Sequence, residues 1–444
     1  MRKVRIVAFF TSVLLLCCGF LGFTGGQQEV QEITVQMWSG PESRAMGTVV
    51  DHWNKNYAEQ MGIKVTLITI GRVGYNEKVT SQLVSGVAKP DLVQIFNWQI
   101  GKLSSYIEPL DSYFKTEYFS SPGGEAYKID SMIDTAFKTG QMKGSTFLLP
   151  TDISWNCMIY RKDLMEKAGL QPPDTWDQIV EVAKKFTKKY NPDSPTQFGT
   201  AAFGKLIFPT WLSFVQILWA YGGSYFKPGT FIPDLNSEAG YKAAKIFWDL
   251  GRSGCIPPDS AESYEFPEVV AAFQNELICF APFWNAAYPI LTNKEQSPRV
   301  YNKMGVTDLP GVRQPDGSIK RSSYIHCISL GINKASKMKD AAFKFLAYAT
   351  FGEGAHIYAK NGGAPPLWDV FTGPNAVEPY KSGAKIIAEY GRTNPPCADM
   401  PALFEIGKVY VQKLLLGEEE GGYKKIMDDL NQEVYNFLKE RGYF

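Results

Sequence analysis

Residues 150–176, PTDISWNCMIYRKDLMEKAGLQPPDTW, constrain the fold more than any other part of the chain. They open with apolar and aromatic residues in a run suited to a buried strand. Residues 161–163 break this run, and Asp163 is expected to cap a short helix at 164–168. Gly169 is expected to end that helix.

A second helix is expected directly after this one. Pro172 and Pro173 prevent the first helix from continuing. Asp174 or Thr175 then supplies an N-cap for a helix that begins at Trp176. A strand followed by two short helices is an arrangement of α/β proteins.

The first section of the chain alternates strands and helices. We expect strands at 33–38, 63–69 and 91–96, with helices at 43–58 and 75–86. A βαβαβ order implies a parallel sheet with helices on both faces.

Later elements follow the same rules. We expect helices at 211–221, from Asn236 or Ser237 to Gly251 or Gly254, and at 266–275, 404–416 and 423–438. Strands are expected at 277–280 and 324–332, the second followed by an amphipathic helix.

Size and composition bound the class of protein. A chain of 444 residues is too long for one ordinary core, so two lobes are expected. The net charge is +1, without a polybasic or acidic tract, so nothing indicates nucleic acid or an anionic membrane as partner. An aromatic content of 14% fits either a large core or ring platforms for ligands.

The N-terminus has the composition of a secretion signal. Arg2, Lys3 and Arg5 precede an apolar stretch at 6–23, and small residues at 24–26 offer a cleavage site. A retained membrane anchor is the alternative reading. Lipid attachment at Cys17 or Cys18 is a third, disfavoured because the preceding residues are not small.

Metal and disulfide frameworks are not indicated. Five cysteines follow the signal, an odd number, and those at 157, 279 and 327 lie in apolar runs typical of buried thiols. The three histidines are far apart in sequence and lack metal-ligand spacing. No metal or cofactor is therefore expected.

Several motifs together carry a family resemblance. YRKDL, EKAGL and PPDTW stand in the stretch described first, and GIKVTLITI, LVSGVAKPDLVQI and IEPLDSYF precede it in order. This sequence resembles extracellular solute-binding proteins of ABC importers, in the sugar-binding branch that includes maltose-binding protein. The resemblance covers nearly all of the chain after the signal.

The resemblance implies a fold and a function. The fold would be α/β, periplasmic-binding-protein-like (type II), with two lobes, a hinge and a ligand cleft between the lobes. We expect a signal peptide at 1–26, an N-terminal lobe of 27–150 plus 306–371, and a C-terminal lobe of 151–305 plus 372–444. The protein would be a secreted or periplasmic monomer that captures a sugar or polyol and delivers it to the membrane permease subunits of an ABC importer.

Candidate ligand contacts follow from the rule that ligands bind at the carboxyl ends of strands in α/β sheets. The positions selected are Trp38, Arg72, Asn97, Trp98, Asp152, Ser154, Trp284 and Asn285. In the sugar-binding branch an aromatic residue at the position of Trp284 stacks on a sugar ring. Trp38, Trp98 and Trp284 each also fit core packing.

Polar candidates each have a structural alternative. Asp152 is suited to accept hydrogen bonds from adjacent hydroxyls, or to a cap or hinge salt bridge. Arg72 and Arg392 offer forked donors, or simply solvated charge. Tyr324 lies on the strand expected to return to the first lobe, on one face with His326, which more often would be a core histidine. Gly363 permits a tight backbone near the cleft or an ordinary turn.

Enzymatic function is the alternative class. No nucleophile elbow, zinc-protease helix or phosphate-binding loop motif occurs. Scattered acids leave a secreted carbohydrate-active enzyme as the runner-up. A binding protein coupled to a sensory receptor would use the same fold. The resemblance favours binding without turnover.

Overall fold

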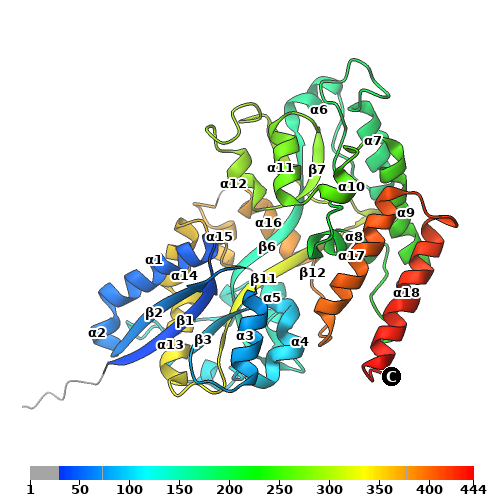
Figure 1. The fold of residues 1–444 in the computed structure, drawn as a ribbon. Coiled ribbons are helices and arrows are strands. Elements are labelled where there is room, and N and C mark those ends of the chain that lie inside the picture. The colour runs from blue at the N-terminus through cyan, green and yellow to red at the C-terminus, as the bar shows by residue number, and fades with distance from the viewer. Residues whose placement is uncertain (1–29, 73, 377) are drawn as a thin grey trace, which may run out of the picture.

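One mixed sheet passes through both halves of the molecule (Figure 1). The structure, a computed structural model, describes residues 30–72, 74–376 and 378–444. The strand order is β2-β1-β3-β11-β6-β7, with β12 paired to β11 and β8 to β6. The strands are β1 (Gln31–Trp38), β2 (Ile63–Ile70), β3 (Leu92–Phe96), β6 (Leu148–Arg161), β7 (Phe280–Trp284), β8 (Met304–Thr307), β11 (Ser323–Ile332) and β12 (Gly391–Arg392).

The first lobe has the expected parallel βαβαβ start. Strand β1 pairs in parallel with β2 and β3, and β3 pairs with β11. Its main helices are α1 (Pro41–Asn56), α3 (Tyr75–Val84), α4 (Ile100–Leu103), α13 (Lys339–Phe351) and α14 (Glu353–Lys360). Helix α1 presents Met46, Val49 and Trp53 to the core at helical spacing. The strand prediction for this lobe is confirmed.

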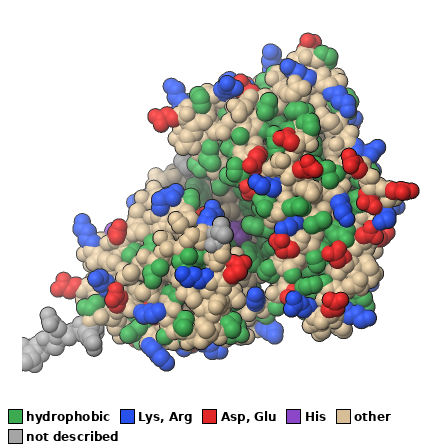
Figure 2. All heavy atoms as spheres, in the orientation of Figure 1, with side chains coloured by type: hydrophobic (Ala, Val, Ile, Leu, Met, Phe, Trp, Pro, Cys, Tyr) green, Lys and Arg blue, Asp and Glu red, His purple; other side chains and the backbone are tan. Residues whose placement is uncertain are grey.

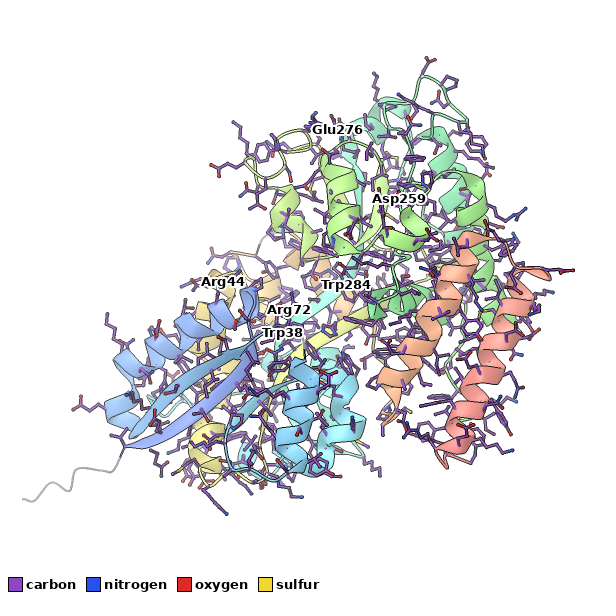
Figure 3. All side chains as sticks on the ribbon, in the orientation of Figure 1. Trp38, Arg44, Arg72, Asp259, Glu276 and Trp284 are labelled. Carbon is purple, nitrogen blue, oxygen red and sulfur yellow. The ribbon has the colours of Figure 1, made fainter. Side chains whose placement is uncertain are left out.

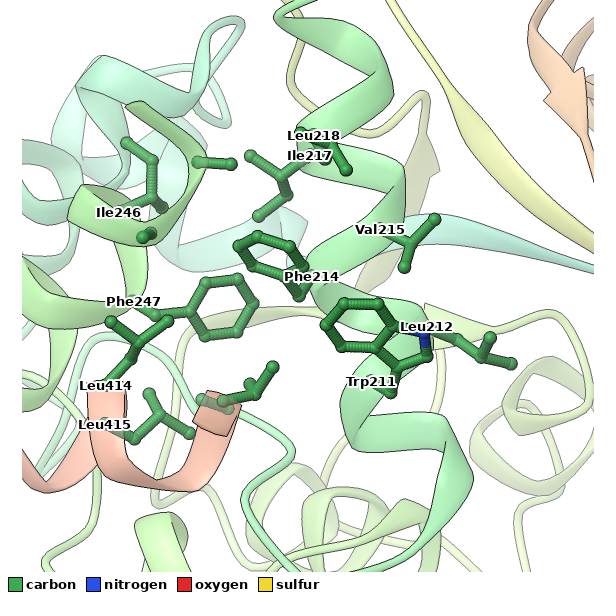
Figure 4. Close-up of a cluster of buried hydrophobic side chains, with 14 of the residues drawn as sticks. Trp211, Leu212, Phe214, Val215, Ile217, Leu218, Ile246, Phe247, Leu414 and Leu415 are labelled. Carbon is green, nitrogen blue, oxygen red and sulfur yellow. The ribbon is translucent and has the colours of Figure 1, made fainter. Parts of the chain in front are cut away.

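The second lobe is mostly helical around one apolar core. Its main helices are α6 (Lys162–Ala168), α7 (Ile179–Lys185), α8 (Phe208–Ala220), α9 (Glu238–Ser253), α11 (Phe266–Gln274), α17 (Met400–Leu416) and α18 (Gly422–Glu440). Figure 4 shows Trp211 and Phe214 of α8 against Phe247 of α9 and Leu414 of α17. Helix α8 is apolar almost all round, as expected for a helix enclosed by other helices.

Two long strands cross between the lobes. The first part of β6 pairs with β11, and its second part pairs with β7 and β8 in the second lobe. Strand β11 reaches from β3 in the first lobe to β12. Trp155 of β6 and Ile325 of β11 pack in one apolar cluster. Because side chains alternate along a strand, Ser154 and His326 face the other side.

The helix starts and ends within residues 161–176 are partly as predicted. Gly169 is in the left-handed conformation (φ 65°) and ends α6, and Thr175 forms a capping box with Gln178. The prediction for Asp163 is wrong: α6 begins at Lys162, so Asp163 lies inside its first turn. Its carboxylate instead accepts hydrogen bonds from the buried Arg161, at 2.8 and 2.6 Å.

Strand β7 begins later than predicted. It spans Phe280–Trp284 rather than 277–280, because Leu277 is exposed and Ile278 forms only an isolated bridge with Phe198. Trp284 is therefore the last residue of a strand.

The chain stays with the second lobe beyond residue 306. Strand β8 pairs with the distal part of β6, and the Gly311 amide donates to the Asp174 carbonyl at 2.9 Å. Residues up to 322 thus lie beside the second lobe, and β11 carries the chain back. The remaining lobe boundaries stay predictions, and the signal at 1–26 lies outside the described residues.

The cysteines in the described part of the chain are all buried, free thiols, including Cys157, Cys279 and Cys327 as predicted. Within the described ranges, no helix has the length and apolar content required to cross a membrane.

Candidate functional site

A groove of about 710 Å³ lies between the lobes. The space-filling view shows this face hollowed where the two lobes meet (Figure 2). Rings from both lobes line the groove, together with a histidine of the crossing strand β11: Trp38, Phe96, Trp98, Phe208, His326 and Phe404. Its charged lining residues are Glu77, Lys102 and Glu405. The groove thus has the apolar walls and sparse polar groups of a small-molecule site.

Trp38 ends β1 at the rim of the groove. Its indole Nε1 donates to Glu42 at 3.2 Å, which holds the ring in place. The Arg72 guanidinium lies 4.0 Å from the ring centroid, a cation–π contact. Figure 3 shows both residues at the junction of the lobes, with Trp284 of the second lobe. A ligand that stacks on the covered face of Trp38 must therefore displace Arg72.

Trp98 follows β3 and reaches the second lobe. Its ring stacks on Phe96 with an interplanar angle of 2° and 5.6 Å between centroids. It also meets the ring of Phe404 of α17, at 5.8 Å and 67°. Rings of the two lobes thus touch at one end of the groove.

His326 lies among aromatic rings. Ring centroids of Phe96, Phe208 and Trp284 are 5.0, 6.3 and 6.3 Å from its imidazole. Burial, and then the nearby Arg72, lower the pKa of His326 to about 4. The imidazole is therefore neutral at physiological pH. The sequence argument favoured a core role for this residue, and only its alternation with Tyr324 pointed towards the groove.

Ser154 and Trp284 lie beside this histidine. Ser154 is directly opposite His326 in the β6–β11 pairing, so both side chains leave the same face of the sheet. Trp284 is half-buried, with its ring edge-on to Tyr324 at 6.2 Å. Asn285 has a structural role, since its Oδ1 accepts from the Trp155 amide at 3.0 Å.

Asp152 and Gly363 lie together but do not line the groove. The Ala364 amide donates to the Asp152 carboxylate at 2.8 Å, and Asp152 as a whole is only 7% exposed. Burial raises the pKa of Asp152 to about 7, against a lowering by the Ala364 hydrogen bond. A Cβ on Gly363 would lie 1.9 Å from the Tyr358 ring, so glycine is required there by close packing.

Three predicted contacts lie away from the groove. Asn97 is buried and donates to Thr393, while its Oδ1 accepts from the Cys327 amide at 3.3 Å. Tyr324 is fully buried in the second lobe, where it stacks on Trp219 at 5.9 Å. Arg392 lines a separate hollow of about 410 Å³. Tyr324 and Arg392 lie away from the groove because β11 and β12 extend past it into the second lobe. Asn97 does so because its amide bonds to Thr393 and to the β11 backbone.

Phe208 and Phe404 were not predicted. Each lies near the start of a helix, α8 and α17, where an apolar residue at helical spacing is normally a core residue. The approach of these helices to the first lobe places them at the groove. Among the described residues, no cluster of histidine, cysteine or acidic side chains could hold a metal ion.

A larger hollow of about 810 Å³ belongs to the second lobe alone. It lies between α7 and α9, where Trp248 stands among charged side chains such as Lys245 and Asp249.

Sequence comparison finds relatives among transport proteins. A probable amino-acid ABC transporter periplasmic-binding protein of Sinorhizobium fredii is 24% identical over 93% of this chain and 90% of its own. An arabinooligosaccharide-binding protein of Bacillus subtilis is 21% identical over 85% and 84%. A mannitol-binding protein of Pseudomonas aeruginosa is 28% identical over 50% and 49%.

Solved structures confirm the two-lobed α/β fold. Maltose-bound MalE3 of T. maritima superposes with a TM-score of 0.74 at 21% identity, covering 92% of this chain and 99% of that one. A ribitol complex of a solute-binding protein from Agrobacterium radiobacter gives 0.74 at 20% identity, with the same coverage.

The sequence pattern of one family matches residues 40–355, which is most of the chain. By this match, the protein belongs to the bacterial extracellular solute-binding proteins.

Proposed function

We propose that this protein captures a sugar or polyol in the groove between its lobes and delivers it to an ABC-type permease. The observation that carries the proposal is that rings of both lobes surround one groove. The C–H faces of sugars and polyols pack well on such rings. A ligand that contacts both lobes favours the closed arrangement, because it binds that arrangement more tightly than the open one.

The relatives support this ligand class. Their names cite an arabinooligosaccharide and mannitol, and the structural neighbours hold maltose and ribitol. One relative is named for an amino acid. The groove does carry Glu77 and Lys102 besides Glu405, which pairs with Lys408, but these charges are fewer than its aromatic rings. Rings rather than paired charges dominate the lining.

The remaining proposals follow from the family. The chain acts as a secreted monomer without a cofactor, after removal of a signal at 1–26. It binds its solute without chemical change, and closed lobes present the solute to permease subunits in the membrane.

Titration calorimetry of the mature protein against sugars, polyols, sugar acids, oligosaccharides and amino acids tests the ligand class. We expect one class of sugar or polyol to bind, and Trp284→Ala to weaken that binding at least tenfold, as loss of a stacked ring predicts. Trp248→Ala is the matched control. Trp248 is also a half-buried tryptophan of the second lobe, but it lines the separate hollow between α7 and α9, whereas the Trp284 ring lies 6.3 Å from the groove residue His326.

Two results would contradict the proposal. Binding of amino acids alone would remove the carbohydrate assignment. Recovery of a cleaved product after incubation would make the protein an enzyme.

A further inference from the structure

His326 has an unusual position for a core histidine. It belongs to β11, which crosses between the lobes, and it lines the groove. Its Nδ1 is buried and has no hydrogen-bond partner in the described part of the chain. Buried polar atoms are nearly always paired, because an unpaired one loses its hydration without compensation. The indole Nε1 of the groove residue Trp98 is likewise buried and unpaired. The Nδ1 of His326 therefore lacks a partner that a ligand can supply once its entry displaces the atoms that cover this nitrogen.

The neighbourhood of His326 suits a neutral hydroxyl. A neutral imidazole has one donor and one acceptor nitrogen, and a hydroxyl both donates and accepts. Ser154 stands opposite on β6, with its own hydroxyl on the same face of the sheet. The rings of Phe96, Phe208 and Trp284 surround the imidazole with apolar surface. Hydrogen bonds in such surroundings discriminate strongly between partners.

Nearby charge argues against a cationic ligand group here. Arg72 is close enough to lower the pKa of the imidazole, together with burial. The same positive charge repels a ligand ammonium at this point. An uncharged alcohol meets no such penalty.

We propose that His326, with Ser154 beside it, determines specificity by hydrogen-bonding one hydroxyl of a neutral sugar or polyol. This assignment rests on the proposed function, and it adds which residues select the ligand. A site built to bind a hydroxyl rejects the analogue that lacks it, since the protein group is then left unpaired. His326 thus acts by contact with the ligand rather than by packing alone.

The test combines variants of the protein with deoxy analogues of the bound solute. His326→Phe keeps an aromatic ring but removes both nitrogens, and His326→Asn places an amide near the position of Nδ1. We expect His326→Phe to bind the parent solute about tenfold to a hundredfold more weakly, as loss of a buried hydrogen bond predicts. His326→Asn should recover part of this loss.

Selectivity separates contact from packing. Wild-type protein should reject one deoxy analogue, and His326→Phe should bind that analogue and the parent solute with similar affinity. Ser154→Ala should weaken discrimination at the same or the adjacent hydroxyl. Circular dichroism and melting temperature establish that each variant is folded.

Three outcomes would overturn the assignment. If His326→Phe retains the wild-type preference for every hydroxyl, His326 does not select the ligand, although the proposed function stands. If His326→Phe weakens the parent and all analogues by the same factor, the role is packing. If the wild type binds no sugar or polyol at all, the proposed function fails and this assignment fails with it.

Discussion

The indole of Trp98 meets the ring of Phe404 edge-on, with 5.8 Å between the ring centroids. Trp98 follows β3 of the first lobe, and Phe404 lies in the second turn of α17 of the second lobe. This contact joins the lobes beside the groove without a charge or a hydrogen bond. Because edge-to-face contacts are weak individually, they permit the lobes to separate and meet again.

We expect Phe404→Leu to weaken ligand binding about threefold to tenfold, since a flat ring contributes roughly 0.5–1.5 kcal/mol beyond its buried area. Phe247→Leu is the control, because Phe247 is similarly buried in the same lobe but lies outside the groove. Both variants should lose about 1 kcal/mol of stability. Equal effects of the two variants on calorimetric affinity would show that Phe404 has no ligand role.

Gly101→Ala tests the lobe arrangement without touching the groove surface. A Cβ at Gly101 in α4 would lie 2.9 Å from the carbonyl carbon and oxygen of Cys397, which precedes α17. Either the backbone at Gly101 or that at Cys397 must therefore shift. We expect a larger radius of gyration by small-angle scattering and weaker ligand binding.

Gly47→Ala is the matched control for this substitution. Its Cβ would make an ordinary 3.8 Å contact with Leu67 within the first lobe. We expect unchanged scattering and affinity, with a small gain in helix stability. Unchanged scattering in Gly101→Ala as well would mean that the contact is absorbed locally.

Asp152 makes stability depend on pH. Its pKa is raised from 3.8 to about 7, mainly by burial, with Glu42 adding repulsion and with the Ala364 amide and Tyr358 opposing the shift. The folded protein therefore holds a proton that the unfolded chain releases near pH 4. The contribution of Asp152 to the free energy of unfolding is therefore complete below about pH 4 and is lost as pH rises to about 7.

Asp152→Asn should remove this loss. At about 1.4 kcal/mol per pK unit, the variant should gain up to about 4 kcal/mol relative to wild type between pH 4 and pH 8. Urea denaturation at three pH values measures the difference. A constant difference across this range would contradict the raised pKa.

His326 makes the free energy of unfolding change with pH in the opposite direction. Its pKa falls from 6.5 to about 4, mainly through burial, so the unfolded chain takes up a proton that the folded protein refuses. The contribution of His326 to the free energy of unfolding is complete above about pH 6.5 and is lost as pH falls to about 4. His326→Phe should resist acid better than wild type between these values, as urea denaturation can show. An unchanged acid profile would contradict the lowered pKa.

Arg161 anchors the start of the second lobe. Its buried guanidinium donates to Asp163 and, at 2.9 Å, to Glu276. We expect Arg161→Met to lose about 1–3 kcal/mol of stability, because both acids are partly exposed and regain water. Lys162→Met removes an exposed pair and should cost under about 1 kcal/mol. Similar melting temperatures for both variants would contradict this role.

The ends of strands were readable from the sequence, and so were the groove residues attached to them. Apolar runs that stop at Trp38 and before Trp98 mark the carboxyl edge of the sheet, and the structure places both side chains at the groove. Phe208 and Phe404 were not readable. Their helical spacing is that of a core residue, and only tertiary packing directs them to the first lobe.

The sequence predicted which side chains share one face of β11, but it did not predict where along the strand the groove lies. Alternation places Tyr324 and His326 on one face. Two residues along a strand span about 6.6 Å, enough to pass from the groove into the core of the second lobe. Where a crossing strand leaves one lobe depends on partners such as β12, which local sequence does not specify.

The two strands that cross between the lobes act mechanically as a pivot. When one body rotates about an axis, a point near the axis travels a short arc and a distant point travels a long one. Ser154 and His326 lie on the crossing strands, whereas Phe404 and Trp38 lie on elements of separate lobes. A solute bound beside the crossing strands therefore keeps nearly the same contacts with them while the lobes rotate. The aromatic rings on the separate lobes travel farther and reach the solute last.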